Sequence, residues 1–336
     1  MDFRQHIQNL AISKNSILEI GPSYNPILPR YKGYPVSIMD HASRSELVEK
    51  YSAFGVDTSK IEDVDHVTTD LSSLYSAGHM FDLIVASHVI EHVTDFIKFL
   101  NDCERLLVEG GQVILIVPDK RNCFDFFRPV TTPGAMLDAH HSKRALHLGG
   151  LFDHYSYFCR NNGQLAWGDL EDVSQLEFIH TPDMTIDAVN KPLLAGEYSD
   201  AHEWVFVPAS FAFALAELRS HRFVNLGIEQ AYATLGYEFM VILSVRAPVE
   251  SRTKAQLLSE IQGEVSAAVH MDLTDSNAVS HAREDLALSS MEQALENKRL
   301  ADVIALQKNQ LDSLYSSTSW RVTLPLRKLR KFLSAL

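Results

Sequence analysis

The sequence predicts an α/β fold, in which a doubly wound, seven-stranded and mostly parallel sheet is followed by a helical extension. Short apolar runs that end in Gly, Pro or Asp alternate with segments of helical periodicity up to residue 120. These runs are apolar almost throughout, which is typical of parallel strands covered by helices on both faces. With 336 residues, of which 46% are hydrophobic, the chain is long enough for one large domain with additional elements.

The elements can be assigned in chain order. We expect five parallel strands at residues 16–20, 35–40, 66–70, 81–86 and 112–117, and two closing strands at 224–234 and 238–245. The clearest helix covers 91–107, because apolar side chains from Val93 to Leu107 recur on one helical face. A second helix, at 208–218, precedes the closing strands.

The remaining segments depart from this alternation. Residues 118–205 are rich in Pro, His and polar side chains, and we interpret them as an irregular insertion within a main domain at 1–249. Residues 250–315 are poor in Gly and Pro and are expected to be helical. Ile304, Leu311 and Leu314 fit a heptad that Gln307 interrupts, so a coiled coil and helices packed on the domain both stay open. Residues 316–336 form a basic amphipathic tail.

Composition and charge argue against several classes of protein. The net charge of -13, from 43 acidic and 30 basic residues, is unlike that of a general nucleic-acid-binding protein. Cys103, Cys123 and Cys159 match neither a zinc motif nor a disulfide framework, so we expect a cytoplasmic location. The many His and Asp side chains could bind a metal ion, but their spacing fits no known motif, so we expect no bound metal. The first residues show no signal-peptide pattern, and the longest apolar stretches fall short of the ~20 residues that span a bilayer.

Acidic residues at the ends of successive predicted strands indicate a ligand site. Gly21 follows the first strand, where the lack of a Cβ lets a ligand approach the backbone. Asp40 ends the second strand and can accept the hydroxyls of a ribose, while Asp70 and Leu71 end the third. Together with Glu19, these acids suit a ligand with a ribose, an amine and a positive sulfonium, whereas the pyrophosphate of a dinucleotide would be repelled. The alternative is that Asp40 and Asp70 merely cap turns.

The order of these motifs resembles the class I S-adenosylmethionine-dependent methyltransferases, which have a Rossmann-like fold. The resemblance covers residues 15–120 closely and 224–245 loosely, and is carried by Glu19-Ile20-Gly21, Asp40, Asp70-Leu71, the Phe-Asp-Leu-Ile to Glu-His-Val segment at 81–93, and Gly110-Gly111. The loop at 22–26 departs from the usual Glu-x-Gly-x-Gly-x-Gly and is similar to a subgroup met in bacterial surface-polysaccharide synthesis. The resemblance implies S-adenosylmethionine as cofactor, with Glu19 and Gly21 bordering its methionine end and Tyr24 and Asn25 of the loop also binding it. It further implies Asp40 at the ribose, Asp70 and Leu71 at the adenine, and Ser87 and His88 beside the sulfonium.

Histidines are the candidate catalytic residues for such a reaction. Methyl transfer from a sulfonium is an in-line displacement, to which positioning of the acceptor can contribute ~7–11 kcal/mol. A sugar hydroxyl also benefits from a general base, and histidine suits this role near neutral pH. We expect His88 nearest the methyl group, with His141 and His154 contributed by the insertion. The alternative for each is a structural role at a helix start or on a surface loop.

The C-terminal residues indicate the acceptor and the partners. The string Ser-Trp-Arg-Val-Thr-Leu-Pro-Leu-Arg at 319–327 resembles a tail of bacterial glycosyltransferases and methyltransferases of cell-surface glycan assembly. It implies O-methylation of a sugar-nucleotide or glycan hydroxyl in polysaccharide synthesis, with 118–205 as the acceptor side and a glycosyltransferase as partner. The basic tail also suits peripheral contact with the inner membrane face. Two alternatives stay open: a methyltransferase for a small metabolite or an amine, and a weakly catalytic adaptor that recruits glycan-assembly enzymes through its C-terminal helices.

Overall fold

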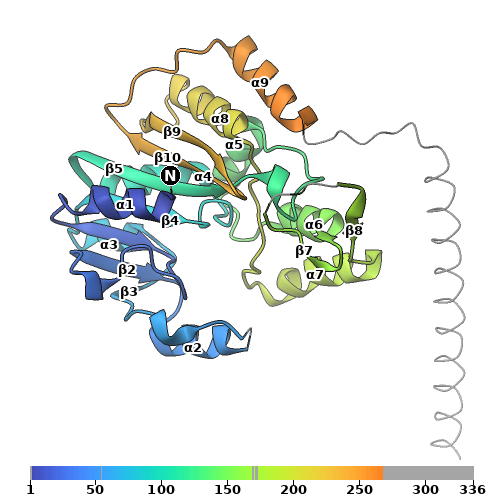
Figure 1. Ribbon diagram of the computed structural model, residues 1–336, viewed down its shortest axis with the longest axis horizontal. Coiled ribbons are helices and arrows are strands. Elements are labelled where there is room, and N and C mark those ends of the chain that lie inside the picture. The colour runs from blue at the N-terminus through green and yellow to red at the C-terminus, as the bar shows by residue number, and fades with distance from the viewer. Residues whose placement is uncertain (1, 54, 169, 171–172, 268–336) are drawn as a thin grey trace, which may run out of the picture. The chain divides into compact units, whose positions relative to one another are not determined.

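A seven-stranded sheet forms the centre of the computed structural model, which describes residues 2–53, 55–168, 170 and 173–267. The strand order is β3-β2-β1-β4-β5-β10-β9 (Figure 1). Five strands run in parallel: β1 (Ile17–Ile20), β2 (Val36–Asp40), β3 (His66–Val67), β4 (Phe81–Ser87) and β5 (Leu107–Pro118). The strands β10 (Glu238–Ser244) and β9 (Gly227–Leu235) close the sheet in antiparallel orientation. The predicted fold class is therefore confirmed.

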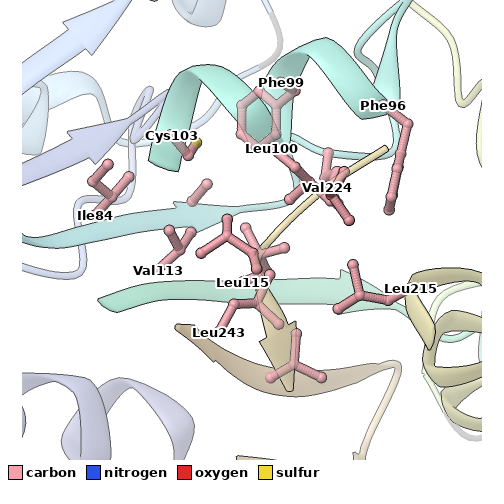
Figure 2. Packing of buried hydrophobic residues seen from close by; sticks show 14 of the residues in the cluster. Ile84, Phe96, Phe99, Leu100, Cys103, Val113, Leu115, Leu215, Val224 and Leu243 are labelled. Carbon is pink, nitrogen blue, oxygen red and sulfur yellow. The ribbon is translucent and has the colours of Figure 1, made fainter. Parts of the chain in front are cut away.

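The sheet is buried on both faces, because its strands direct alternate side chains into two apolar cores. On β5, Val113 and Leu115 pack in the first core, whereas Ile114 and Ile116 pack in the second. Figure 2 shows the first core, where Leu100 lies between its helix and the sheet. The first core also receives side chains from α3 (Ser72–Ser76), α4 (Phe96–Leu106), α5 (Pro133–Ser142) and α8 (Pro208–Ser220), and the second from α1 (Phe3–Ala11).

The helix after β4 begins at Phe96, so the predicted start at Glu91 is wrong. Asp95 caps the first turn of α4 with its side chain. The backbone carbonyl of Glu91 accepts the N–H groups of Glu203 at 2.7 Å and Trp204 at 3.1 Å. Because this carbonyl is bonded to a distant segment, the chain forms a turn at 91–95 before the helix starts.

The segment 118–205 contains regular elements, so the expectation of an irregular insertion is also wrong. It holds α5, α6 (Leu148–Tyr157), α7 (Pro182–Ala195) and a three-stranded antiparallel sheet of β7 (Gln164–Leu165), β6 (Cys159–Asn161) and β8 (Leu176–Phe178). Strands of two or three residues are too short to show an alternating pattern in the sequence. The other elements are α2 (Arg44–Ser52) and short 3-10 helices at Arg30–Lys32, Thr58–Lys60, Lys120–Asn122 and Val173–Gln175.

The last described element is α9 (Lys254–Ala267), which agrees with the helix expected at the start of 250–315. It packs on α8, where the N–H of Ala209 donates to Oε2 of Glu264 at 3.0 Å. The rest of that segment, with the predicted coiled coil, and the basic tail at 316–336 lie outside the described residues. Within the part of the chain that the structure describes, no helix is long and apolar enough to cross a membrane.

Candidate active site

Three of the predicted cofactor residues, Gly21, Asp40 and Ser87, lie where the parallel strands end. In the register of the sheet, Ile20 of β1 lies beside the residues that precede Asp40 in β2 and Ser87 in β4. Gly21, Asp40 and Ser87 therefore stand at the same level along one edge of the sheet. The strand order reverses between β1 and β4, and doubly wound sheets bind their ligands at such a reversal.

Gly21 and Glu19 shape the loop that follows β1. Gly21 has a φ of +63°, and a Cβ on it would lie 3.0 Å from Cγ2 of Val89, so a larger residue would be strained. The buried carboxylate of Glu19 accepts the N–H groups of Ile27 at 2.6 Å and Leu28 at 3.1 Å. Burial raises the pKa of Glu19 to about 7, although the two amide donors oppose this shift. Glu19 therefore holds the loop in place.

The carboxylate of Asp40 is buried beside the same loop. Its Oδ1 accepts the N–H of His41 at 2.7 Å and contacts Nδ1 of that ring at 2.6 Å. Its Oδ2 accepts the N–H of Ser23 at 3.2 Å, and Ser23 has a left-handed φ of 49°. Tyr24 and Asn25 are exposed on the outside of the loop. The structure thus places Asp40 at the strand end, with a backbone donor and an imidazole on its oxygens.

Asp70 and Leu71 lie at the start of α3. The carboxylate of Asp70 accepts the hydroxyl of Ser72 at 2.5 Å and the Nζ of Lys98 at 3.0 Å. These hydrogen bonds lower the pKa of Asp70 to about 2. Leu71 is buried in the first core. The contacts of Asp70 match the alternative in which it caps a turn, and its side chain stays 56% exposed.

Four ionisable side chains meet just beyond β4. We call His88, Glu91, His92 and His202 the histidine–carboxylate cluster. Glu91 is fully buried at its centre. Its Oε1 lies 3.3 Å from Nδ1 of His88, 3.8 Å from Nε2 of His92 and 4.0 Å from Nε2 of His202. Sequence reasoning singled out His88 but missed the cluster, because His88, Glu91 and His92 lie within five residues whereas His202 lies far along the chain.

His88 follows β4 with a left-handed φ of 53°, and its Nε2 lies 2.7 Å from Oε2 of Glu238. Burial by itself would lower the pKa of His88, but the carboxylates of Glu238 and Glu91 outweigh burial and raise the pKa to about 9. The ring is therefore an imidazolium near neutral pH and cannot accept a proton. This charge state does not support the predicted role of His88 as general base, although its position at the strand end matches the prediction.

The other two predicted catalytic histidines lie in different places. His154 of α6 approaches the cluster, with its ring centroid 6.1 Å from that of His202. Burial lowers the pKa of His154 to about 3, so this ring is neutral near pH 7. His141 is exposed at the end of α5, and its ring contacts Phe223, which follows α8, at 6.4 Å. The structure therefore brings His154 to the cluster and leaves His141 on the surface, where the predicted catalytic role has no support.

Three aromatic rings, those of Phe124, Trp167 and Tyr237, form what we call the aromatic wall, and Trp167 and Tyr237 lie beside His88. The centroid of Trp167 lies 4.6 Å from that of Tyr237, 5.4 Å from that of Phe124 and 5.6 Å from that of His88. Tyr237 comes from the turn between β9 and β10, whereas Phe124 and Trp167 come from the insertion. Trp167 therefore brings the insertion next to His88 at the end of β4. A hollow of about 400 Å³ lies farther out on it and is bordered by His154.

Comparisons with known proteins place this geometry in context. A family model described as a methyltransferase domain matches residues 2–170, about half of the 336 residues. The ubiquinone biosynthesis O-methyltransferase of Parvibaculum lavamentivorans is 40% identical over 52 residues, which are 16% of this chain and 21% of that protein. The corresponding protein of Cereibacter sphaeroides is 37% identical over 51 residues, 15% of this chain and 21% of that protein. The chain thus spans about a fifth of the length of these curated relatives.

Two solved structures are also similar to this chain. One is an S-adenosylmethionine-dependent methyltransferase from Clostridium acetobutylicum, at 11% identity and a TM-score of 0.38, covering 73% of this chain and 92% of that chain. The other is the CcbJ methyltransferase from Streptomyces caelestis, at 10% identity and a TM-score of 0.39, covering 72% of this chain and 87% of that chain.

Proposed function

The chain belongs to the family of methyltransferase domains, so its doubly wound domain is an S-adenosylmethionine-dependent methyltransferase domain, and we propose that it methylates a hydroxyl group of a sugar or glycan. The aromatic wall beside His88 is the observation that supports this acceptor. The role in polysaccharide synthesis is part of the same proposal and rests on the resemblance of the C-terminal residues to those of glycan-assembly enzymes.

The strand ends suit the cofactor in a definite orientation. In our proposal Asp40 accepts the two ribose hydroxyls, because a carboxylate at the tip of the second strand can bind both. The ribose would then replace the present contact between Asp40 and the ring of His41. The loop after Gly21 receives the methionine end, and Ser87 stands beside the sulfonium, at the strand end nearest the aromatic wall.

The aromatic wall suits a sugar ring as acceptor. Trp and Tyr rings present an apolar face together with a polar edge, so they can stack on the C–H face of a sugar. Trp167 and Tyr237 are both partly exposed, and the charged pair of His88 and Glu238 lies next to them. These groups can bond the hydroxyls of the sugar while the rings hold its plane. Such positioning behind the methyl carbon is the main contribution that a methyltransferase makes to the rate.

Calorimetric titration with S-adenosylmethionine tests the placement of the cofactor. Replacing Asp40 with Ala should weaken binding about tenfold or more, because hydrogen bonds to a charged group contribute about 1.5–3 kcal/mol. The matched control is Asp63→Ala, since the Asp63 side chain is 86% exposed and should leave the affinity unchanged. Equal affinity of Asp40→Ala and the wild-type protein would refute the ribose contact.

A methyl-transfer assay tests the acceptor. The protein and labelled S-adenosylmethionine would be incubated with sugar nucleotides and glycans in one set of reactions, and with phenols and amines in a second set. We expect transfer to the sugar pool, and a several-fold rise in KM for the sugar on replacing Trp167 with Ala. Transfer to phenols alone would overturn the sugar proposal and favour the second candidate, a small-metabolite O-methyltransferase. That candidate is supported by the short match to relatives named for ubiquinone biosynthesis.

A further inference from the structure

Two distant segments are joined at the histidine–carboxylate cluster. Glu91 and His92 lie in the turn between β4 and α4, whereas His202 lies in the segment between α7 and α8. The backbone carbonyl of Glu91 accepts the N–H groups of Glu203 and Trp204 at 2.7 and 3.1 Å. The backbone therefore fixes the position of His202 relative to Glu91, independently of their side chains.

The carboxylate of Glu91 faces the ring of His88 but lacks the hydrogen bonds that its burial requires. Its exposure is 0%, and among the described residues neither of its oxygens makes a hydrogen bond. The nearest nitrogen, Nδ1 of His88 at 3.3 Å, is poorly aligned for one. A buried carboxylate is costly unless it is paired and hydrogen-bonded or coordinates a metal ion. This carboxylate points instead at a group of imidazole nitrogens.

Each of the two histidines that face Glu91 has an outer carboxylate close to its Nδ1 atom. Nδ1 of His92 lies 2.8 Å from Oδ1 of Asp200, and Nδ1 of His202 lies 2.5 Å from Oδ2 of Asp125. Of these two contacts, the one between His202 and Asp125 is a hydrogen bond, whereas Nδ1 of His92 is close to Asp200 without being aligned for one. A histidine that donates its Nδ1 proton to a carboxylate, as His202 can, presents the lone pair of Nε2 on its other side. In both rings this Nε2 is the atom directed at Glu91, at 3.8 and 4.0 Å. Metal-binding histidines usually have a carboxylate or carbonyl next to the ring nitrogen that does not bind the metal.

From these contacts we infer that Glu91, His92 and His202 form a binding site for a divalent transition-metal ion such as Zn²⁺. Their ligand atoms all lie within 4.8 Å of one another. Around an ion with metal–ligand distances of about 2.0–2.1 Å, ligand atoms stand about 3.0–3.4 Å apart. The two imidazole nitrogens, now 3.8 and 4.0 Å from Oε1 of Glu91, would approach it by about half an ångström, and ligand atoms as far as 4.8 Å apart would close by about 1.4 Å. Two imidazoles and one carboxylate are a recurrent ligand set for zinc and leave a coordination position open. Magnesium and calcium prefer oxygen ligands and suit the site poorly.

Metal titration at neutral pH tests this inference. The full chain is purified without a polyhistidine tag and is first freed of metal ions with a chelator. The wild-type protein should bind one Zn²⁺ at this site with micromolar affinity or better, and Co²⁺ in its place should give the absorption spectrum of a site with imidazole ligands. Glu91→Gln and His202→Ala should each weaken binding at least about a hundredfold. The matched control His221→Ala replaces an exposed histidine at the end of α8 and should leave binding unchanged.

A third variant keeps the test decisive if the buried variants fail to fold. The Asp200 side chain is 63% exposed, so Asp200→Asn should fold, and loss of the carboxylate behind His92 should weaken Zn²⁺ binding about 10–100-fold. A rise in the melting temperature of the wild-type protein with Zn²⁺, reduced in Asp200→Asn, would support the site. The inference is overturned if the wild-type protein binds no ion, or if Asp200→Asn and folded Glu91→Gln bind as tightly as the wild type.

Discussion

The buried carboxylate of Glu19 should make the stability of the cofactor-free protein depend on pH in a predictable way. The pKa of Glu19 rises from 4.5 to about 7 in the folded protein. One pKa unit corresponds to about 1.4 kcal/mol, so ionisation destabilises the folded state by about 3.4 kcal/mol in all. Because the folded state holds this proton more tightly than the unfolded state, the contribution is fully present below pH 4.5 and is lost as the pH rises through 7.

Urea unfolding of the wild-type protein and Glu19→Gln at several pH values measures this effect. Glutamine does not titrate, so the difference in unfolding free energy between the two proteins should change by about 2.5 kcal/mol between pH 5 and pH 8, in favour of the variant. Taking the difference removes the other titrating groups. Glu49→Gln, at an exposed position of α2, serves as control and should follow the wild type. A difference that stays constant with pH would refute the raised pKa.

Two further predictions concern packing, and urea unfolding checks both. A Cβ on Gly150 would lie 1.8 Å from Oε2 and 3.1 Å from Cα of Glu203, so Gly150→Ala should lower the unfolding free energy by about 1–3 kcal/mol. The control is Gly149→Ala, whose added Cβ meets nothing within 4 Å and should leave the unfolding free energy unchanged. Equal stability of these two variants would contradict the close contact. Phe96→Ala removes a ring that is 0% exposed in the first core and should cost about 3–5 kcal/mol. Phe152→Ala, at a position 46% exposed, should cost far less, and a loss of the same size would show that Phe96 is not packed as described.

The sheet could be predicted because each strand carries its own signal. The strands β1, β2, β4 and β5 are predominantly apolar, as expected of parallel strands that are buried on both faces. The start of α4 could not be predicted in the same way. Residues 91–95 fit the helical pattern, but the carbonyl of Glu91 bonds to Glu203 and Trp204 instead of continuing a helix.

The cofactor-binding residues at the strand ends could be predicted from the same strand signals. Once the strands are recognised, Gly21, Asp40 and Ser87 must stand along one edge, because parallel neighbours end at the same level. No comparable sequence signal identifies the residues on the acceptor side. His141 and His154 were equivalent candidates by sequence, and the packing of α5 against α8 and of α6 beside the cluster separated them.

The sequence by itself determined the doubly wound sheet and the strand-end residues, since apolar periodicity and strand order are properties of short stretches of chain. The tertiary structure alone decided the charge of His88, which depends on Glu238 and Glu91. It also decided the cluster, because the burial of Glu91 and the approach of His202 arise from contacts between segments far apart in the chain. A pKa and a set of facing ligand atoms depend on neighbours in space, and those neighbours exist after folding.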